Sequence, residues 1–401
     1  MELQNVRVDR PAPGRARLTG EVRYDDPAFP AESYWFDVPE RYADDLSATG
    51  NPWLVCLAPL AATCGEPLRI GLPVDRLLAR NVVELLRIWS VWYPSLESVP
   101  LELEKSDPPP EVETGRTGAF FSGGVDSFFT VLRHRKGDAG GLSADDLILV
   151  RGFDFPLEHA EAFVRHRERM SRAAEELGME LVDVSTNLRE TRLREASWAD
   201  LWHGSALGSV GLALERRYSL LILASTSSYG ELEPYGSHPM TDVLFSTQST
   251  RMLHDGACAT RLDKMEYLAG SSLALEYLHV CFREISDLNC GRCRKCSLTM
   301  LGLALCGAGD RWRTFPAGGP DLERVARILF TTKGQKRGVR RLRALAVRRG
   351  RRDIVRAIDR ALRRSALVGA AVGALDGAGR VRDLSTLSRR IRRSLVSRMV
   401  R

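Results

Sequence analysis

One stretch of the chain decides the fold: Gly118-Ala119-Phe120-Phe121-Ser122-Gly123-Gly124-Val125-Asp126-Ser127. It starts as a short apolar run typical of a buried strand and continues into a segment with helical spacing. Consecutive glycines let the backbone turn sharply, so that its N–H groups face inward near the positive end of the helix. The stretch therefore predicts a strand, an anion-binding loop and a helix, with a junction that binds no ligand as the alternative.

The segments that follow alternate between strands and helices. Short apolar runs are separated by longer stretches with helical spacing. We expect strands at Leu147–Val150, Glu180–Val184 and Leu220–Ala224, and helices at Ser127–Arg135, Pro156–Leu177 and Ser205–Arg217. This alternation predicts the α/β class, with a doubly wound parallel sheet that has helices on both faces.

Three regions are expected along the chain. Residues 1–107 predict a separate α+β module, with strands at Ala16–Tyr24 and Ser33–Val38 and helices near Arg41–Cys64 and Asp75–Trp92. Pro108-Pro109-Pro110 marks a linker. Residues 115–310 hold the alternating strands and helices. Residues 311–401 are basic and largely helical, with a break near Gly369–Gly379.

The composition is that of a globular protein, since the 401 residues are 44% apolar and 27% charged. No apolar run is long enough for a membrane-spanning helix, and the N-terminus lacks a secretory signal, so we expect a cytoplasmic location. Eight cysteines fit this compartment as free thiols or metal ligands.

Polar side chains complete the predicted anion site. Ser122 and Ser127 can donate hydrogen bonds to phosphate oxygens, and Asp126 can hold Mg²⁺ or cap the helix. The loop lacks the Gly-Lys-Ser/Thr ending of a Walker A motif, so we do not expect transfer of a γ-phosphate.

A compact group of cysteines follows about 160 residues later, as Cys281-x8-Cys290-Gly-Arg-Cys293-Arg-Lys-Cys296. Four thiolates at this spacing are enough for a closed tetrahedral zinc site. Because such a site leaves no coordination position for water or substrate, we expect the zinc to be structural. An iron–sulfur cluster and a group of free thiols are the alternatives.

Together, the Ser-Gly-Gly-Val-Asp-Ser loop and the cysteine group resemble the N-type ATP pyrophosphatases, also called PP-loop or adenine nucleotide α-hydrolase-like (HUP) enzymes. The spacing of the cysteines is most similar to that of the 7-cyano-7-deazaguanine synthases. The resemblance covers roughly residues 115–310. It implies that the loop, Ser122–Ser127, binds the pyrophosphate of ATP, with Mg²⁺, and that the enzyme adenylates an oxygen of its substrate before a nucleophile displaces AMP.

Further candidates lie at the expected carboxyl ends of strands, where sheet-based nucleotide sites form. The resemblance places the adenine or ribose near Gly152, Phe153 and Asp154. Thr186 and Asn187 follow the next strand and can meet nucleotide or substrate. His203 and Gly204 open a helix, where they can face an anion or simply cap the helix.

A long polar loop, Ser225–Asp242, is the expected place of the acceptor substrate, with a Pro/Gly-rich surface loop as the alternative. Its candidate contacts are Tyr229, Ser237, His238 and Asp242. His238 is also a candidate acid–base group. Beyond the loop, Thr260-Arg261-Leu262-Asp263-Lys264 resembles the Thr-x-x-x-Lys segment that family members use near phosphates or substrate, which implies a catalytic Lys264 and a binding role for Arg261.

The C-terminal part is strongly basic. Residues 331–401 contain 22 Lys and Arg against 4 Asp and Glu, a net charge of +18 in a chain whose total is +7. Residues 337–349 predict an amphipathic helix with a basic face. Its expected partner is the chain's own acidic part or an acidic protein, nucleic acid such as tRNA, or an anionic membrane surface. The apolar helix Leu77–Trp92 is a candidate interface for a homo-oligomer.

These features predict an ATP-dependent ligase that acts on a small-molecule carboxylate or carbonyl oxygen, with ammonia or an amine as the nucleophile. A sulfurtransferase of the same fold, acting on tRNA or a small molecule with Cys258 as sulfur carrier, is the second hypothesis. A non-catalytic nucleotide-binding protein is the third.

Overall fold

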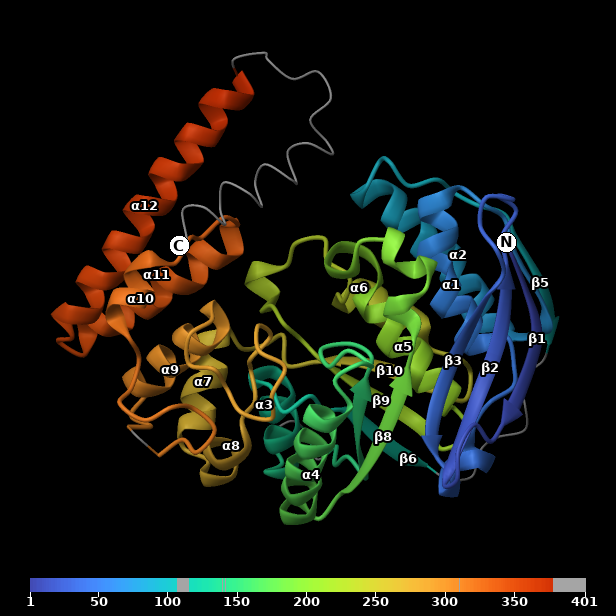
Figure 1. The fold of residues 1–401 in the computed structure, drawn as a ribbon, viewed down its shortest axis with the longest axis horizontal. Coiled ribbons are helices and arrows are strands. Elements are labelled where there is room, and N and C mark those ends of the chain that lie inside the picture. Colours follow the sequence, from blue (N-terminus) through green and yellow to red (C-terminus); the bar gives the residue numbers. More distant parts are fainter. Residues whose placement is uncertain (107–114, 139, 141, 310, 378–401) are drawn as a thin grey trace. The chain divides into compact units, whose positions relative to one another are not determined.

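The computed structural model describes residues 1–106, 115–138, 140, 142–309 and 311–377. They form two compact units, Met1–Leu288 and Asn289–Arg401. Ten strands of the first unit form one sheet, in the order β10-β9-β6-β7-β8-β3-β2-β1-β4-β5 (Figure 1). The strands are β1 (Glu2–Asp9), β2 (Arg15–Arg23), β3 (Glu32–Pro39), β4 (Leu68–Asp75), β5 (Leu101–Ser106), β6 (Arg116–Phe120), β7 (Asp146–Arg151), β8 (Glu180–Thr186), β9 (Tyr218–Ala224) and β10 (Arg251–Asp255).

Six of the nine neighbouring pairs in this sheet are parallel, among them all the pairs from β10 to β8. The chain starts this half at β6, adds β7 and β8 on one side, and then returns to add β9 and β10 on the other side. A topological switch point therefore lies between β6 and β9. Ligands of open α/β sheets bind outside the carboxyl ends of the strands at such a point.

Helices cover both faces of the parallel half. The helices of the first unit are α1 (Asn51–Cys64), α2 (Arg76–Trp92), α3 (Val125–Arg135), α4 (Ala160–Leu177), α5 (His203–Ala213), α6 (Pro239–Asp242), α7 (Arg261–Ala269) and α8 (Ser272–Tyr277). Met252 and Asp255 of β10 point to opposite faces because strand side chains alternate. A Cβ on Gly211 of α5 would lie 3.4 Å from Met252, whereas Thr130 of α3 donates a 2.8 Å hydrogen bond to Asp255. The predicted α/β class, with a mostly parallel sheet between helices, is confirmed.

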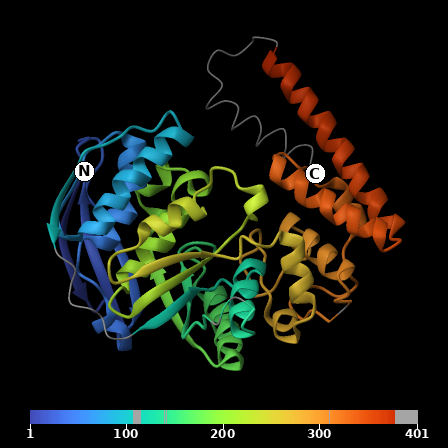
Figure 2. The same cartoon turned by 180° about the vertical axis from the view of Figure 1, so that it is seen from behind.

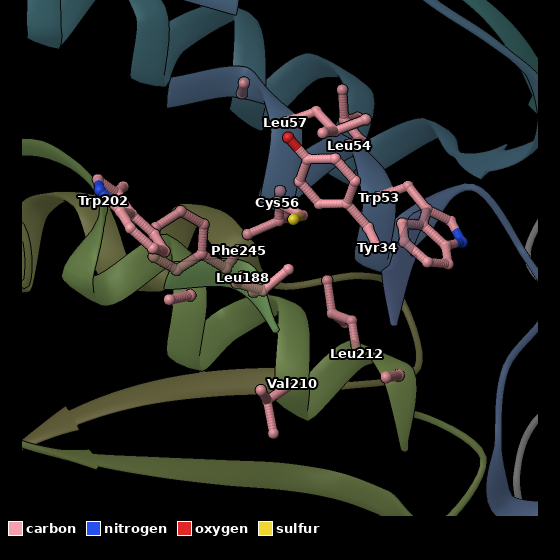
Figure 3. Packing of buried hydrophobic residues seen from close by; sticks show 14 of the residues in the cluster. Tyr34, Trp53, Leu54, Cys56, Leu57, Leu188, Trp202, Val210, Leu212 and Phe245 are labelled. Atoms are coloured by element: carbon pink, nitrogen blue, oxygen red, sulfur yellow. The ribbon is translucent and has the colours of Figure 1, made fainter. Parts of the chain in front are cut away.

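The N-terminal strands belong to the same sheet as the parallel half. β3 runs antiparallel to β8, with Phe36 opposite Thr186 and Asp37 opposite Ser185. A shared core lies between α1 and the α5 region, where Trp53 and Cys56 pack with Leu212 and other buried side chains (Figure 3). The expected module of residues 1–107 thus extends the central sheet, and its expected Pro108–Pro110 linker lies outside the described residues.

Several predicted elements need correction. The expected helix near Arg41–Cys64 is a short 3-10 turn, Glu40–Asp45, followed by α1, and the residues between Gly65 and α2 form β4. Strands β1, β5 and β10 were not expected. The break expected near Gly369 is wrong, because α12 (Arg352–Gly377) continues through this glycine; the remainder of that range lies outside the described residues.

A buried carboxylate ties the N-terminal region to α5. Glu215 accepts hydrogen bonds from Ser47 Oγ at 2.6 Å, from Thr49 Oγ1 at 2.8 Å and from Asn51 Nδ2 at 2.9 Å. Burial raises the pKa of Glu215, although these three donors favour its charged form. Since the donors come from one short segment before α1, this carboxylate fixes where that helix starts.

Glu215→Gln is expected to lower the free energy of unfolding by about 1–3 kcal/mol, because an amide NH₂ would face the Asn51 donor inside the core. Burial raises the pKa of the folded carboxyl above its unfolded value of about 4.3, so the folded protein keeps the Glu215 proton to a higher pH than the unfolded chain does. The free energy of unfolding of wild type therefore falls as pH rises from the unfolded pKa to the folded pKa. The stability gap between wild type and Glu215→Gln should therefore narrow from pH 4 to pH 7 in denaturant titrations. Glu190→Gln, at an exposed site, is the control.

The second unit is helical where the structure describes it. Its helices are α9 (Arg294–Leu305), α10 (Leu322–Arg327), α11 (Lys333–Arg348) and α12 (Arg352–Gly377). α11 and α12 lie side by side in both views (Figures 1 and 2), and both pack within the unit against α9 or α10. α11 is the amphipathic helix expected from residues 337–349, and its apolar side chains Val339, Leu342 and Leu345 are buried.

Among the described residues, no helix is both long and apolar enough to cross a membrane. The apolar face of α2 is buried in its own unit, with Leu85 and Trp89 in the core. A surface groove of about 1020 Å³ runs between α2 and β5, and Val83 and Arg80 are among its lining residues. Formation of a homo-oligomer through α2 stays a prediction.

Candidate functional site

The loop predicted to bind phosphate, Ser122–Ser127 (here named the phosphate loop), follows β6 at the switch point of the sheet. Gly123 has φ +75°, and a Cβ there would lie 2.6 Å from Met170 Sδ, so both backbone conformation and space require glycine. Gly124 precedes α3, and no side chain caps the N–H groups of that helix. Ser122 is exposed at the same place. This loop therefore presents backbone donors at the positive end of an 11-residue helix, as an anion site requires.

Two cations converge on the loop from a distant part of the sequence. Asp126 Oδ1 accepts a 3.0 Å hydrogen bond from Lys264 Nζ, and Asp126 Oδ2 accepts one from Arg261. Lys264 also donates to the carbonyl oxygen of Ser225, at the carboxyl end of β9. Both carboxylate oxygens of Asp126 are therefore engaged by cations, and the residue is not an open Mg²⁺ ligand in this structure.

The local sequence of α7 explains how Lys264 reaches the loop. Thr260 caps this helix through a capping box with Asp263, in which each side chain bonds the other residue's backbone. The helix therefore starts at Arg261, and Lys264 follows on its first turn. Lys264 is fully buried, and its ammonium is satisfied by Asp126 and Ser225. The Thr-x-x-x-Lys segment and the phosphate loop are thus brought together.

Two buried histidines, His166 and His279, contribute to the surroundings of the phosphate loop. His166 of α4 stacks on Phe155 with ring centroids 4.6 Å apart, and its pKa is held well below the usual range, chiefly by burial. His279 N–H donates a 2.7 Å hydrogen bond to the carbonyl oxygen of Gly123. The loop is therefore held by backbone and ring contacts and by its own serines, since Ser127 Oγ donates to the Gly124 carbonyl oxygen and Ser122 Oγ accepts from the Gly124 N–H.

The residues after β7 form a tight turn. Gly152 has φ +101°, and a Cβ there would lie 1.9 Å from the Thr186 carbonyl oxygen, so this position requires glycine. The ring of Phe153 is buried and packs against Trp198 at 5.1 Å, whereas Asp154 is exposed. Of this predicted adenine or ribose segment, Asp154 is the side chain that reaches solvent at the strand ends.

Thr186 and Asn187 pair with β3 instead of facing the phosphate loop. Thr186 Oγ1 donates to the Trp35 carbonyl oxygen at 2.7 Å, and Asn187 bonds the Trp35 N–H at 3.0 Å and the Ser33 carbonyl oxygen at 2.7 Å. These side chains thus extend the antiparallel pairing of β3 with β8. Their predicted contact with nucleotide or substrate has no support in this geometry.

The predicted acceptor loop contains a buried polar cluster around Asp242. This carboxylate accepts hydrogen bonds from Ser237 Oγ at 2.6 Å and from the His238 N–H at 3.1 Å, and it bonds His254 Nδ1 at 2.7 Å. A Cβ on Gly204 would lie 2.6 Å from Asp242 Oδ1, so glycine at the start of α5 makes room for the cluster. Three predicted residues, Ser237, His238 and Asp242, are therefore in mutual contact.

His238 acts as a helix cap in this structure. Its Nδ1 accepts a hydrogen bond from the Met240 N–H at 3.1 Å, and its ring packs edge-on against Trp92 at 4.9 Å. Burial and the neighbouring His254 lower its pKa, against the opposite effect of Asp242. A neutral imidazole with Nδ1 engaged is the form that this geometry favours, and its Nε2 is the atom left for proton transfer.

Tyr235 interacts electrostatically with three carboxylates outside this loop. Burial raises its pKa, and the carboxylates of Asp200, Asp154 and Asp126 raise it further. Its ring also contacts that of His203 at 6.2 Å. Tyr229, in contrast, is exposed, and the Gly204 N–H is used by the Gly236 carbonyl oxygen. The acceptor loop therefore lies near the acidic side chains at the strand ends.

Comparisons of the chain with family models, curated proteins and solved structures found no match. Membership of the N-type ATP pyrophosphatases thus stays a prediction that rests on the motifs and their geometry.

The four predicted cysteines form one cluster. The sulfur atoms of Cys281, Cys290, Cys293 and Cys296 all lie within 4.8 Å of one another. Zinc–sulfur bonds of about 2.3 Å in a tetrahedron place sulfur atoms about 3.8 Å apart, and Cys290 Sγ lies 3.9 Å from Cys296 Sγ. The Cys293 and Cys296 N–H groups donate to Cys290 Sγ and Cys293 Sγ at 3.2 and 3.4 Å. This donor set fits a structural metal such as zinc.

Several residues of this region were missed from the sequence. His254 lies in β10, a strand of five residues of which only Met252 and Leu253 are apolar, so its sequence gives a weak strand signal. His166 and Arg133 lie on helices whose contacts cannot be read from spacing, and Tyr235 is one polar residue among many in its loop. The register of strand ends around the switch point is the signal that could have identified His254, because it lies one residue before the end of β10.

Proposed function

We propose that this chain is an AMP-forming, ATP-dependent ligase, a distant member of the N-type ATP pyrophosphatases. The observation that carries the proposal is the phosphate loop at the switch point, whose Asp126 holds Lys264 and Arg261 beside an uncapped helix N-terminus. Backbone N–H groups and two cations at one strand end suit a pyrophosphate, which carries several negative charges.

In the first step, an acceptor carboxylate oxygen attacks the α-phosphorus of ATP, and the bond to the bridging oxygen breaks so that pyrophosphate leaves. Lys264 and Arg261 stabilise the negative charge that grows on the leaving group. The loop N–H groups orient the phosphates, and the exposed Ser122 supplies a hydroxyl donor, whereas the buried Ser127 hydroxyl bonds the Gly124 carbonyl oxygen. Mg²⁺ would enter with the ATP phosphates, since Asp126 is engaged with its two cations.

In the second step, ammonia or an amine attacks the carbonyl carbon of the acyl adenylate. The C–N bond forms, the C–O bond to AMP breaks, and the nitrogen loses a proton to a base. Ser225–Asp242 is the segment that we assign to the acceptor, because Tyr235 lies within electrostatic reach of Asp126 and Asp154. His238 and His254 are the histidines of this segment and of the neighbouring strand β10.

Product analysis tests this function. The purified chain should be incubated with ATP, Mg²⁺, ammonia and a panel of carboxylic acids, and the nucleotides and phosphates separated by anion-exchange chromatography. AMP and pyrophosphate in equal amounts are expected. Release of ADP and phosphate would exclude adenylation, and tight ATP binding without turnover by any acid would favour the non-catalytic nucleotide-binding hypothesis.

An exposed thiol favours sulfur transfer as a second candidate function. Cys258 lies in the turn between β10 and α7, two residues before the cap of the helix that carries Lys264. A guanidinium nitrogen of Arg133 lies 3.3 Å from its Sγ. A sulfur carrier needs such an accessible thiol near the adenylated atom.

Cys258→Ala is expected to abolish sulfur transfer to an adenylated acceptor if this thiol carries the sulfur, and to leave AMP formation with ammonia unchanged. Thiolated product and AMP should be measured in the same reaction by mass spectrometry. Cys64→Ala is the control, because that thiol is partly buried and burial raises its pKa to about 11. Full sulfur transfer by Cys258→Ala would remove the thiol-relay mechanism.

A further inference from the structure

The apolar side of α11 is already used within its own unit. Val339, Leu342, Leu345 and Ala346 are buried, and α11 packs on α9 and α12. An amphipathic helix binds a membrane surface by burying its apolar face in the headgroup region. Since most of this face is covered, the helix offers partners mainly its basic side, with Val347 in its last turn as an exposed apolar residue.

The acidic side chains of this unit are also already used. Among the side chains that the structure describes in Asn289–Arg401, four are acidic. Each of these four forms an ion pair with an arginine. The pairs are Asp321–Arg324, Glu323–Arg360, Asp353–Arg351 and Asp359–Arg343. These four acidic side chains cannot neutralise the basic side chains of the unit, which outnumber them.

Exposed arginines therefore remain that form no ion pair among the described residues, although Asp359, which pairs with Arg343, also interacts electrostatically with Arg363. They share a position on α11, on α12 or in the turn between them, and they are Arg340, Arg348, Arg349, Arg352, Arg356 and Arg363. Like charges this close repel one another, so a surface of this kind is stabilised when a polyanion binds it.

Three of these arginines form a straight row on α12. Arg352, Arg356 and Arg363 fall within about 40° of one another around a helix of 3.6 residues per turn. At about 1.5 Å per residue, the row is about 16 Å long, which equals the rise of about five base pairs of a duplex. Guanidinium groups bind phosphate through paired N–H donors, so the row can contact several phosphates of a nucleic-acid backbone.

The surrounding residues restrict how a nucleic acid can be read. The sequence has no aromatic residue after Phe330, so bases have no ring to stack on. Single-stranded nucleic acid depends on such stacking, whereas a duplex presents its phosphates outside paired bases. We propose that the arginine row of α12, with the arginines of the α11–α12 turn, binds the phosphate backbone of double-stranded nucleic acid without sequence preference.

Fluorescence anisotropy of the full chain with a labelled 20-base-pair duplex tests this proposal. Wild type is expected to bind with an affinity that falls steeply and log-linearly with salt. The triple variant Arg352→Gln, Arg356→Gln, Arg363→Gln should bind at least tenfold more weakly at about 100 mM salt, with a salt slope smaller by about 2–3, because up to three phosphate contacts are lost. Changing the three arginines to lysine should leave the salt dependence of the affinity as in wild type.

A matched control removes the same charge elsewhere. Arg23, Arg194 and Arg216 are exposed arginines of the first unit, and their replacement by glutamine should leave duplex binding unchanged. Equal loss in both triple variants would show a general charge effect and overturn the proposal. The proposal would also be overturned if wild type did not bind the duplex at about 100 mM salt. Tighter binding to poly-glutamate than to the duplex would overturn it as well, and would indicate that the row binds an acidic protein. Circular dichroism checks that each variant is folded.

Discussion

Replacing Lys264 by methionine is expected to lower the rate of ATP-dependent pyrophosphate release by about 10²–10³-fold, the loss that follows removal of one charge-stabilising donor. The ammonium bonds Asp126 at 3.0 Å and the Ser225 carbonyl oxygen, so it joins the phosphate loop to the end of β9. Methionine has a similar length, so it leaves no cavity at the buried position, and Asp126 keeps its bond from Arg261. ATP affinity, measured by calorimetry, should fall with the rate.

Lys136→Met is the control for this variant. Lys136 is exposed at the end of α3, and its ammonium lies over the Tyr267 ring at 4.8 Å. Its loss should leave ATP binding and pyrophosphate release at wild-type levels. If Lys264→Met were folded and retained full activity, Lys264 would not be needed to stabilise the leaving pyrophosphate, and this part of the proposed first step would be wrong.

Cys296→Ser is expected to remove a bound metal and to lower the melting temperature by more than about 10 °C, since a closed metal site contributes several kcal/mol to folding. Cys296 is fully buried, and its sulfur lies within 4.8 Å of the other three. Wild type should contain one zinc per chain by plasma mass spectrometry. A chelator should destabilise wild type and leave the variant unchanged.

Cys306→Ser tests whether any thiol change has this effect. Cys306 follows α9 and lies outside the cluster, so zinc content and melting temperature should stay near those of wild type. Iron with labile sulfide in place of zinc would show an iron–sulfur cluster. Wild type without any metal would contradict the metal-site assignment.

The parallel half of the fold was predictable because its information is local. Leu147–Val150 and Leu220–Ala224 are apolar runs bounded by polar turns, and both are strands within two residues of the expected bounds. β4 was missed because Gly71 and Pro73 interrupt its pattern. The pairing of β3 with β8 joins residues about 150 positions apart, and no local pattern encodes it.

The candidate site was predictable to the extent that motifs mark it. The phosphate loop and Lys264 both lie in recognisable segments, and the structure joins them through Asp126. Thr186 and Asn187 have the right position after a strand, but β3 uses their hydrogen-bonding groups. Which polar groups remain for a ligand depends on long-range packing, which the sequence of one segment does not contain.

The pairing of β3 with β8 has a consequence for how the chain can be divided. Without residues 1–106, β8 would become an open edge, with backbone N–H and C=O groups that no neighbouring strand satisfies. Such an edge pairs readily with other chains, and Glu215 would lose the donors that surround it. A fragment that begins at residue 115 should therefore aggregate, although it contains the entire phosphate loop. The parallel half of the sheet is therefore not expected to fold on its own.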